Sequence, residues 1–167
     1  MEVLRRDDGL PEELRREALA RVEHYVLDPE ELNRESWGIA SKPARDTAFY
    51  QKAVLKMEEA CRLVPEQGDY LNTLGMALYR TGQYGRAVEI LTRSEKLNAQ
   101  AKGLLPGDLA FLAMAHQELG HKEEAQTALT RLRQIMRSPA WATDLEAKAF
   151  TIEAETLIQG QMTKPGK

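Results

Sequence analysis

The chain has a single cysteine, Cys61, so no disulfide bond can form within it. A lone cysteine fits a reducing compartment. The amino terminus, MEVLRRDDGL, lacks the apolar core of a signal peptide. No window of the sequence approaches the ~18 apolar residues that a membrane-spanning helix needs. We therefore expect a protein of the cytoplasm that does not enter a membrane.

A concentrated basic region is also missing. The chain has 23 lysines and arginines against 26 aspartates and glutamates, and its net charge is −3. The arginines are mixed with acids, as in LPEELRREALARVE, which is typical of a solvent-facing helix with i,i+4 pairs. Binding of nucleic acid normally needs a basic face, so we expect no nucleic-acid partner.

Residue sets typical of catalysis or metal binding are missing as well. His24, His116 and His121 have no further ligands at the spacing of a zinc site. Gly82 and Gly85 stand between two predicted helices, whereas a phosphate-binding loop follows a strand. Cys61 and His116 fit packing roles. The sequence therefore predicts no enzyme, no metal site and no cofactor.

Helical periodicity is what the sequence does contain. Apolar residues make up 43% of the chain, which is enough for a folded core. They recur at helical spacing, as at Tyr84, Ala87, Val88 and Leu91, and no sustained alternation indicates a strand. The sequence predicts an all-α fold with helices near 12–26, 29–41, 46–63, 67–81, 84–97, 105–119, 122–136 and 142–159.

Two stretches of the sequence repeat one another. TLGMALYRTGQYGRA (73–87) aligns with FLAMAHQELGHKEEA (111–125), so that Gly75 matches Ala113 and Ala87 matches Ala125. These small residues fit places where two helices of a hairpin approach closely. Gly82 and Gly120 fit helix ends, where glycine accepts the left-handed conformation. A weaker copy, residues 34–65, precedes these two.

The repeat length and pattern resemble the tetratricopeptide repeat, whose signature is W-x2-L-G-x2-Y, then A-x3-F, then P. From Arg34 to Gly68 is 34 residues, and from Gly68 to Pro106 is 38. The extra four are expected in a loop around 100–103. The resemblance implies one solenoid domain at 11–160, built from antiparallel helical hairpins, with capping helices at both ends. The implied hairpins are 29–63, 67–97 and 105–136, the implied caps are 12–26 and 142–159, and the implied flexible ends are 1–10 and 161–167.

A longer resemblance covers residues 28–159. The run ACRLVPEQGDYLNTLGMALYRTGQYGRAVEILTRSEKLN, with the later LPGDLAFLAMAHQELGHKEEA, resembles the carboxy-terminal repeat segment of large bacterial serine/threonine protein kinases and WD40-repeat proteins. The chain has no kinase glycine-rich loop, catalytic loop or DFG motif. The resemblance thus implies an interaction module without its enzyme, which has a regulatory or scaffold role in signalling.

This family binds peptides or proteins on a concave face lined by the first helix of each hairpin. By repeat position, the amide of Asn72 could bind a peptide backbone, and Arg80 could pair with a carboxylate. Tyr79 and the methionines would give apolar contact. The residues that the resemblance places on this face are Asn72, Met76, Tyr79, Arg80, Met114, Gln117 and Glu118.

The alternative is a spacer or self-association element without a separate ligand. Apolar residues such as Ile135, Trp141 or Phe150, if they stood at an incompletely capped end of the array, would favour it through end-to-end stacking.

Overall fold

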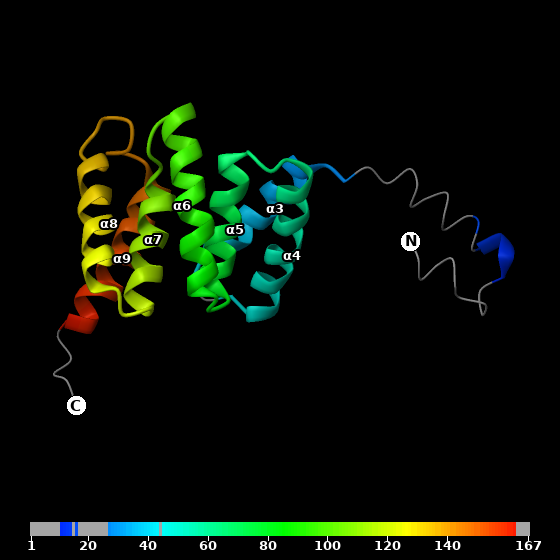
Figure 1. The fold of residues 1–167 in the computed structure, drawn as a ribbon, viewed down its shortest axis with the longest axis horizontal. Helices are drawn as coiled ribbons and strands as arrows, with labels where there is room; N and C mark the ends of the chain where they lie inside the picture. The colour runs from blue at the N-terminus through cyan, green and yellow to red at the C-terminus, as the bar shows by residue number, and fades with distance from the viewer. Residues whose placement is uncertain (1–10, 15, 17–26, 44, 163–167) are drawn as a thin grey trace.

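The computed structural model describes residues 11–14, 16, 27–43 and 45–162. Within these ranges the regular structure is helical and no strand occurs, which confirms the all-α prediction. The predicted helix at 12–26 lies mostly outside the described residues. So do the predicted flexible ends, apart from residues 161 and 162, which lie in the last helix. The long helices, shown in Figure 1, are α3 (Pro29–Ala40), α4 (Thr47–Leu63), α5 (Gly68–Arg80), α6 (Tyr84–Ala101), α7 (Pro106–Glu118), α8 (Lys122–Ile135) and α9 (Leu145–Met162).

Each helix packs against the next one along the chain, from α3 to α9. In addition, α3 contacts α5, α5 contacts α7, and α7 contacts α9. We call the side on which α3, α5, α7 and α9 follow one another the inner face. Figure 1 shows α3 and α4 at one end of the row and α8 and α9 at the other, with α5 and α6 between them.

The helix ends follow from local sequence. The side chains of Asp28 and Asp46 cap α3 and α4 by accepting hydrogen bonds from the backbone N–H groups of Glu30 and Ala48, both at 2.9 Å. Gly82 and Gly120 follow α5 and α7 with φ values of 76° and 78°, in the left-handed region. The predicted glycine helix ends are thereby confirmed.

Gly75 lies where α5 and α6 touch. A Cβ atom built on Gly75 would stand 2.4 Å from Cγ of Leu91 on α6, which is far inside van der Waals contact. Ala87, also on α6, is fully buried. The close approach predicted from the small residues of the repeat is therefore present between these two helices.

Two helices differ in extent from the prediction. α6 continues to Ala101, so the extra residues before the next helix lengthen α6 instead of forming a loop at Gln100. Gly103, with a φ of 102°, comes just after this added turn. α9 begins at Leu145 rather than 142, because Asp144 caps it by accepting a 2.8 Å hydrogen bond from the Ala147 N–H group.

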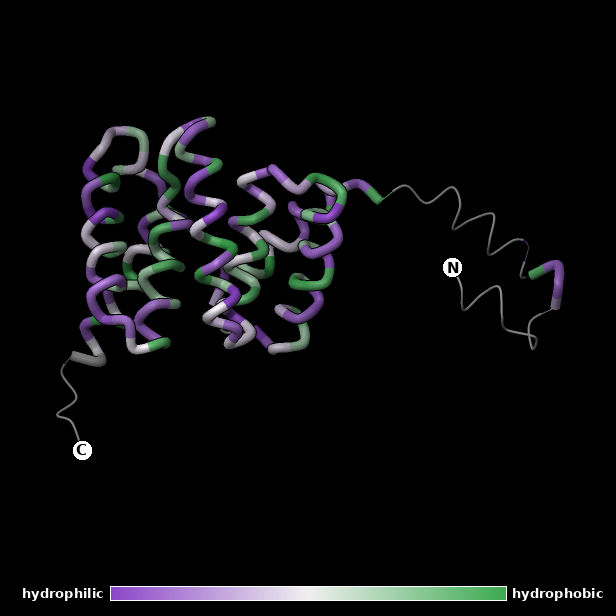
Figure 2. Tube along the Cα trace, in the orientation of Figure 1, coloured by the Kyte–Doolittle hydropathy of each residue, from purple (hydrophilic) through white to green (hydrophobic). Residues whose placement is uncertain are grey.

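Helix α7 is the centre of the core. Nearly all of its residues are buried, because α5, α6, α8 and α9 all pack against it. A helix covered on every side needs no polar face, whereas a surface helix such as α8 does. Figure 2 shows more hydrophilic residues on α8 than on α7. Among the described residues, no helix is both long and apolar enough to cross a membrane.

Candidate functional site

The residues predicted to bind a partner all lie on α5 or α7, but few of them are open to solvent. Asn72, Met76, Met114 and Gln117 are buried. Tyr79 is half-buried, the Arg80 side chain is almost fully buried, and Glu118 is exposed. In this conformation most of the predicted set packs within the inner face.

Arg80 is held by three neighbours. Both of its terminal nitrogens donate to the Glu153 carboxylate on α9, with Nη2–Oε2 at 2.8 Å, and its Nε donates to the Ala40 carbonyl oxygen at 3.1 Å. The guanidinium carbon also lies 4.9 Å from the ring centre of Phe111. Arg80 thus links α5 to α9 and to the end of α3. A carboxylate ligand at this position would have to replace Glu153.

A row of aromatic rings crosses the inner face. Neighbouring ring centres are 5.5 Å apart from Tyr84 to Tyr79, 5.4 Å from Tyr79 to Phe111 and 5.5 Å from Phe111 to Phe150. Phe150 then meets Trp37 at 6.1 Å, edge to face. These spacings are those of attractive aromatic pairs. The row connects helices that lie far apart in sequence, and Phe150 of α9 is buried in it rather than exposed at an open end.

A pocket lies at the end of this row. Its volume is about 170 Å³, and its aromatic walls are Trp37 of α3, Trp141 of the loop before α9, and Phe150 of α9. We call it the tryptophan pocket. Both tryptophans of the chain line it. Its other lining residues are Asn72, Leu105, Pro106, Gly107, Asp144, Glu146 and Ala147.

Two carboxylates border the tryptophan pocket, and each is oriented by a hydrogen bond. Glu146 accepts the indole N–H of Trp37 through its Oε1 atom at 3.2 Å. Asp144 caps α9 through its Oδ1 atom. None of the described lining residues is basic. The pocket thus joins apolar aromatic walls to a negatively charged rim.

A buried polar network lies behind Asn72. Asn72 donates to Oδ1 of Asp108 at 2.6 Å, and Asn98 donates to Oδ2 of the same carboxylate at 3.1 Å. Burial raises the pKa of Asp108 to about 6, even though its hydrogen bonds act in the opposite direction. The network leaves no room for a side chain at Gly68, where a Cβ atom would stand 2.2 Å from Oδ1 of Asn98.

The sequence prediction did not single out Asp108 or Asn98. One signal was available for Asp108: in the repeat alignment it stands opposite Tyr70, so an ionisable residue replaces a large aromatic one. Nothing in the local pattern indicates that Asn98 would reach it, since Asn98 lies in the added turn of α6.

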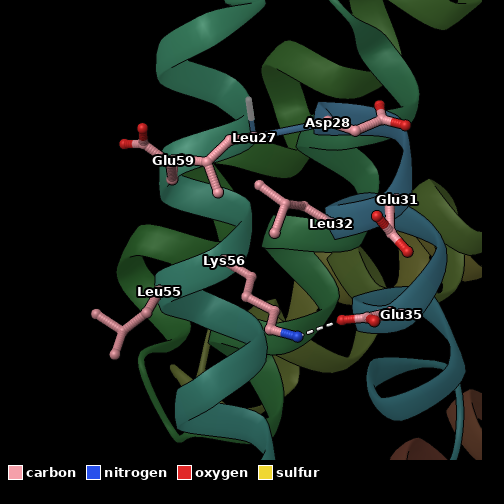
Figure 3. A pocket seen from close by; sticks show the side chains of 8 residues that line it. All are labelled: Leu27, Asp28, Glu31, Leu32, Glu35, Leu55, Lys56 and Glu59. Atoms are coloured by element: carbon pink, nitrogen blue, oxygen red, sulfur yellow. Dashed lines mark hydrogen bonds and ion pairs between the residues drawn. The ribbon is translucent and has the colours of Figure 1, made fainter. Parts of the chain in front are cut away.

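A second, larger groove runs between α3 and α4 and has a volume of about 530 Å³. Figure 3 shows Lys56 reaching across it to Glu35, and Leu55 also lines it. Leu55 is 67% exposed. Glu59, also on this groove, is paired with Arg62 at 2.7 Å, so much of the acidic charge here is compensated.

Reactive groups elsewhere are weakly placed for catalysis. Burial raises the pKa of the Cys61 thiol to about 11, which disfavours the reactive thiolate. His116 and His121 bring their Nδ1 atoms within 3.4 Å of each other, and burial followed by the His121 charge lowers the pKa of His116. Among the described residues, no group of three or more side chains is placed to hold a metal ion.

A comparison with models of known protein families gives no match, and a comparison with curated proteins gives none either.

Proposed function

We propose that this chain is a non-catalytic interaction module that binds a peptide or protein partner on the inner face of a tetratricopeptide-type solenoid. The repeated pattern at 73–87 and 111–125, the packing of each helix on the next, and the close contact of Gly75 with Leu91 support this architecture. The resemblance of residues 28–159 favours a regulatory or scaffold role in a bacterial kinase-type signalling protein of the cytoplasm.

The observation that carries this proposal is the tryptophan pocket. Asn72, Met76 and Met114 are buried and Arg80 is paired with Glu153, so little of the predicted face is free to touch a partner. The tryptophan pocket opens on the same inner face and is lined by Trp37 and Trp141, which are only half-buried. Tryptophan is the residue type most enriched at the energetic centres of protein interfaces. We therefore expect an anchoring side chain of the partner to bind in this pocket.

Selection from a random peptide library on the immobilised full chain tests this function. We expect a recurring sequence pattern among the selected peptides, and binding that is lost in Trp141→Ala, because this substitution removes one aromatic wall from a loop outside the helices. The control is Glu123→Gln/Glu124→Gln, which changes exposed residues in the first turn of α8. No recurring pattern, or equal binding by Trp141→Ala and the wild type, would count against a binding module.

The alternative, self-association or a spacer role, is supported by exposed apolar side chains at both ends of the row. Leu55 on α4 is 67% exposed, and Leu145 and Ile152 on α9 are 80% and 63% exposed. Leu145 and Ile152 are seven residues apart, so they share one face of α9. Light scattering separates the two functions. If the wild type is a dimer and Leu145→Glu/Ile152→Glu is a monomer, end-to-end association is favoured.

A further inference from the structure

We propose that the tryptophan pocket binds an alkylammonium group, namely the side chain of a lysine in the partner. This inference rests on the proposed binding function and names the chemistry of the anchoring side chain. The methylene stem of the lysine would lie against Leu105, Pro106 and Ala147, and its ammonium group would lie among the rings of Trp37, Trp141 and Phe150.

The aromatic walls favour a cation. The face of an aromatic ring carries partial negative charge, indole most strongly, and rings that line a recess attract ammonium groups. Three of the lining residues here are aromatic, and two of these are tryptophans. The volume of about 170 Å³ exceeds that of a single water, roughly 30 Å³, several times. The tryptophan pocket is therefore large enough for the end of a side chain, and its aromatic walls attract a positively charged group.

The rim decides between a cation and a neutral apolar side chain. An apolar ligand would remove water from the Asp144 and Glu146 carboxylates without pairing them, which is unfavourable. Each carboxylate uses one oxygen in the hydrogen bond described above. Within the described part of the chain, the second oxygen of each makes no hydrogen bond, so both can face an ammonium group.

The helix dipoles oppose a cation but are outweighed. α7 and α9 both begin beside the pocket, and the amino end of a helix carries about half a positive charge. Two such ends amount to about one positive charge, whereas Asp144 and Glu146 carry two negative ones. The sum remains negative at the rim, and no basic side chain among the described lining residues reverses it.

Tryptophan fluorescence reports directly on this pocket, because both tryptophans of the chain line it. The probe is n-butylammonium chloride, titrated into the full chain at constant ionic strength. Butan-1-ol, of similar size but neutral, is the comparison ligand. We expect a saturable fluorescence change with n-butylammonium, and binding of butan-1-ol that is weaker by about tenfold. Shifts of the indole N–H signals of Trp37 and Trp141 in a ¹⁵N–¹H NMR spectrum locate the binding.

A variant that removes only charge completes the test. Asp144→Asn/Glu146→Gln keeps an oxygen to cap α9 and an oxygen to accept the Trp37 N–H, so the fold is retained. We expect it to weaken n-butylammonium binding by about tenfold and not to weaken butan-1-ol binding, because the cost of desolvating the two charges is removed as well. Glu123→Gln/Glu124→Gln, which removes the same charge from the first turn of α8, is expected to bind like the wild type.

Three results would overturn the assignment: no saturable change, equal binding of the neutral probe, or equal binding by Asp144→Asn/Glu146→Gln. Failure of this inference is distinct from failure of the proposed function. If selected peptides lack a basic residue but still need Trp141, the module stands and the lysine assignment falls. If n-butylammonium binds selectively but no peptides are selected, the cation pocket stands and the peptide-binding function falls.

Discussion

Arg80 on α5 and Glu153 on α9 form a two-pronged ion pair across the inner face, 73 residues apart in the sequence. The Arg80 side chain is only 7% exposed and that of Glu153 is 25% exposed. Removing one partner of a buried pair leaves a charge that water cannot reach, and this costs more than the pair contributes. The stability of the chain should therefore be sensitive to a substitution at either member of this pair, which links α5 to α9.

We expect Glu153→Gln to lower the free energy of unfolding by about 1–3 kcal/mol, because Arg80 would keep its charge without a carboxylate. Glu155, which pairs with Arg133 of α8 at 2.7 Å, supplies the matched control. Both members of that second pair are more exposed, so Glu155→Gln is expected to change stability by less than about 1 kcal/mol. Urea unfolding of the three proteins measures the difference. Equal losses in the two variants would contradict a special role for Arg80.

Gly75→Ala tests the close contact between α5 and α6. The added methyl group would collide with Leu91, and such overpacking costs about 1–3 kcal/mol. Gly38 lies inside α3 with open space where a Cβ atom would stand. Gly38→Ala is expected to raise stability by up to about 1 kcal/mol, since alanine is the better helix former. Melting temperatures that move in opposite directions would support this geometry, and a rise in both would refute it.

Asp108 predicts a specific dependence of stability on pH. Its pKa is raised to about 6 in the folded chain, compared with 3.8 as the ordinary value. The folded state therefore holds this proton over a range in which the unfolded chain has released it. The contribution of Asp108 to the free energy of unfolding is fully present below about pH 4 and is lost as the pH rises to about 6. Its total size is on the order of 2–3 kcal/mol.

The variant Asp108→Asn isolates this effect, because other titrating groups cancel when it is compared with the wild type at each pH. We expect the free energy of unfolding of the wild type, relative to Asp108→Asn, to fall between pH 4 and pH 6 and then to stay level. The measurement is urea unfolding at pH 4, 5, 6 and 7. A relative stability that does not change with pH would show that Asp108 titrates at its ordinary pKa.

Cys61 is expected to react slowly with thiol reagents. Its pKa of about 11 in the folded chain leaves about a hundredfold less thiolate at pH 8 than a thiol with a pKa of 9 would have. Reaction with Ellman's reagent is expected to be slower by about this factor in the native chain than in urea, and to keep accelerating up to pH 10. A native rate that levels off near pH 9 would contradict the raised pKa.

The extent of sequence prediction differs between local and distant features. Gly82, Gly120 and the contact at Gly75 were predictable, because helix ends and hairpin contacts depend on residues close together in the repeat. The ion pair of Arg80 with Glu153 and the contact of Trp37 with Phe150 were not. They join helices separated by several others, and helical periodicity carries no information about such pairs. For this reason the sequence prediction placed residues on an open face that are largely buried or paired in the structure.

The inner face also has a mechanical consequence. α3 and α9 are joined by long side chains, through Trp37 to Phe150 and Glu146, while each helix backbone packs on its immediate neighbours. A small rotation at each successive helix interface therefore adds up along the row and is largest across this span. Trp37 closes this span through its contacts with α9, and a ligand that separated Trp37 from α9 would be expected to change the superhelical twist of the whole array.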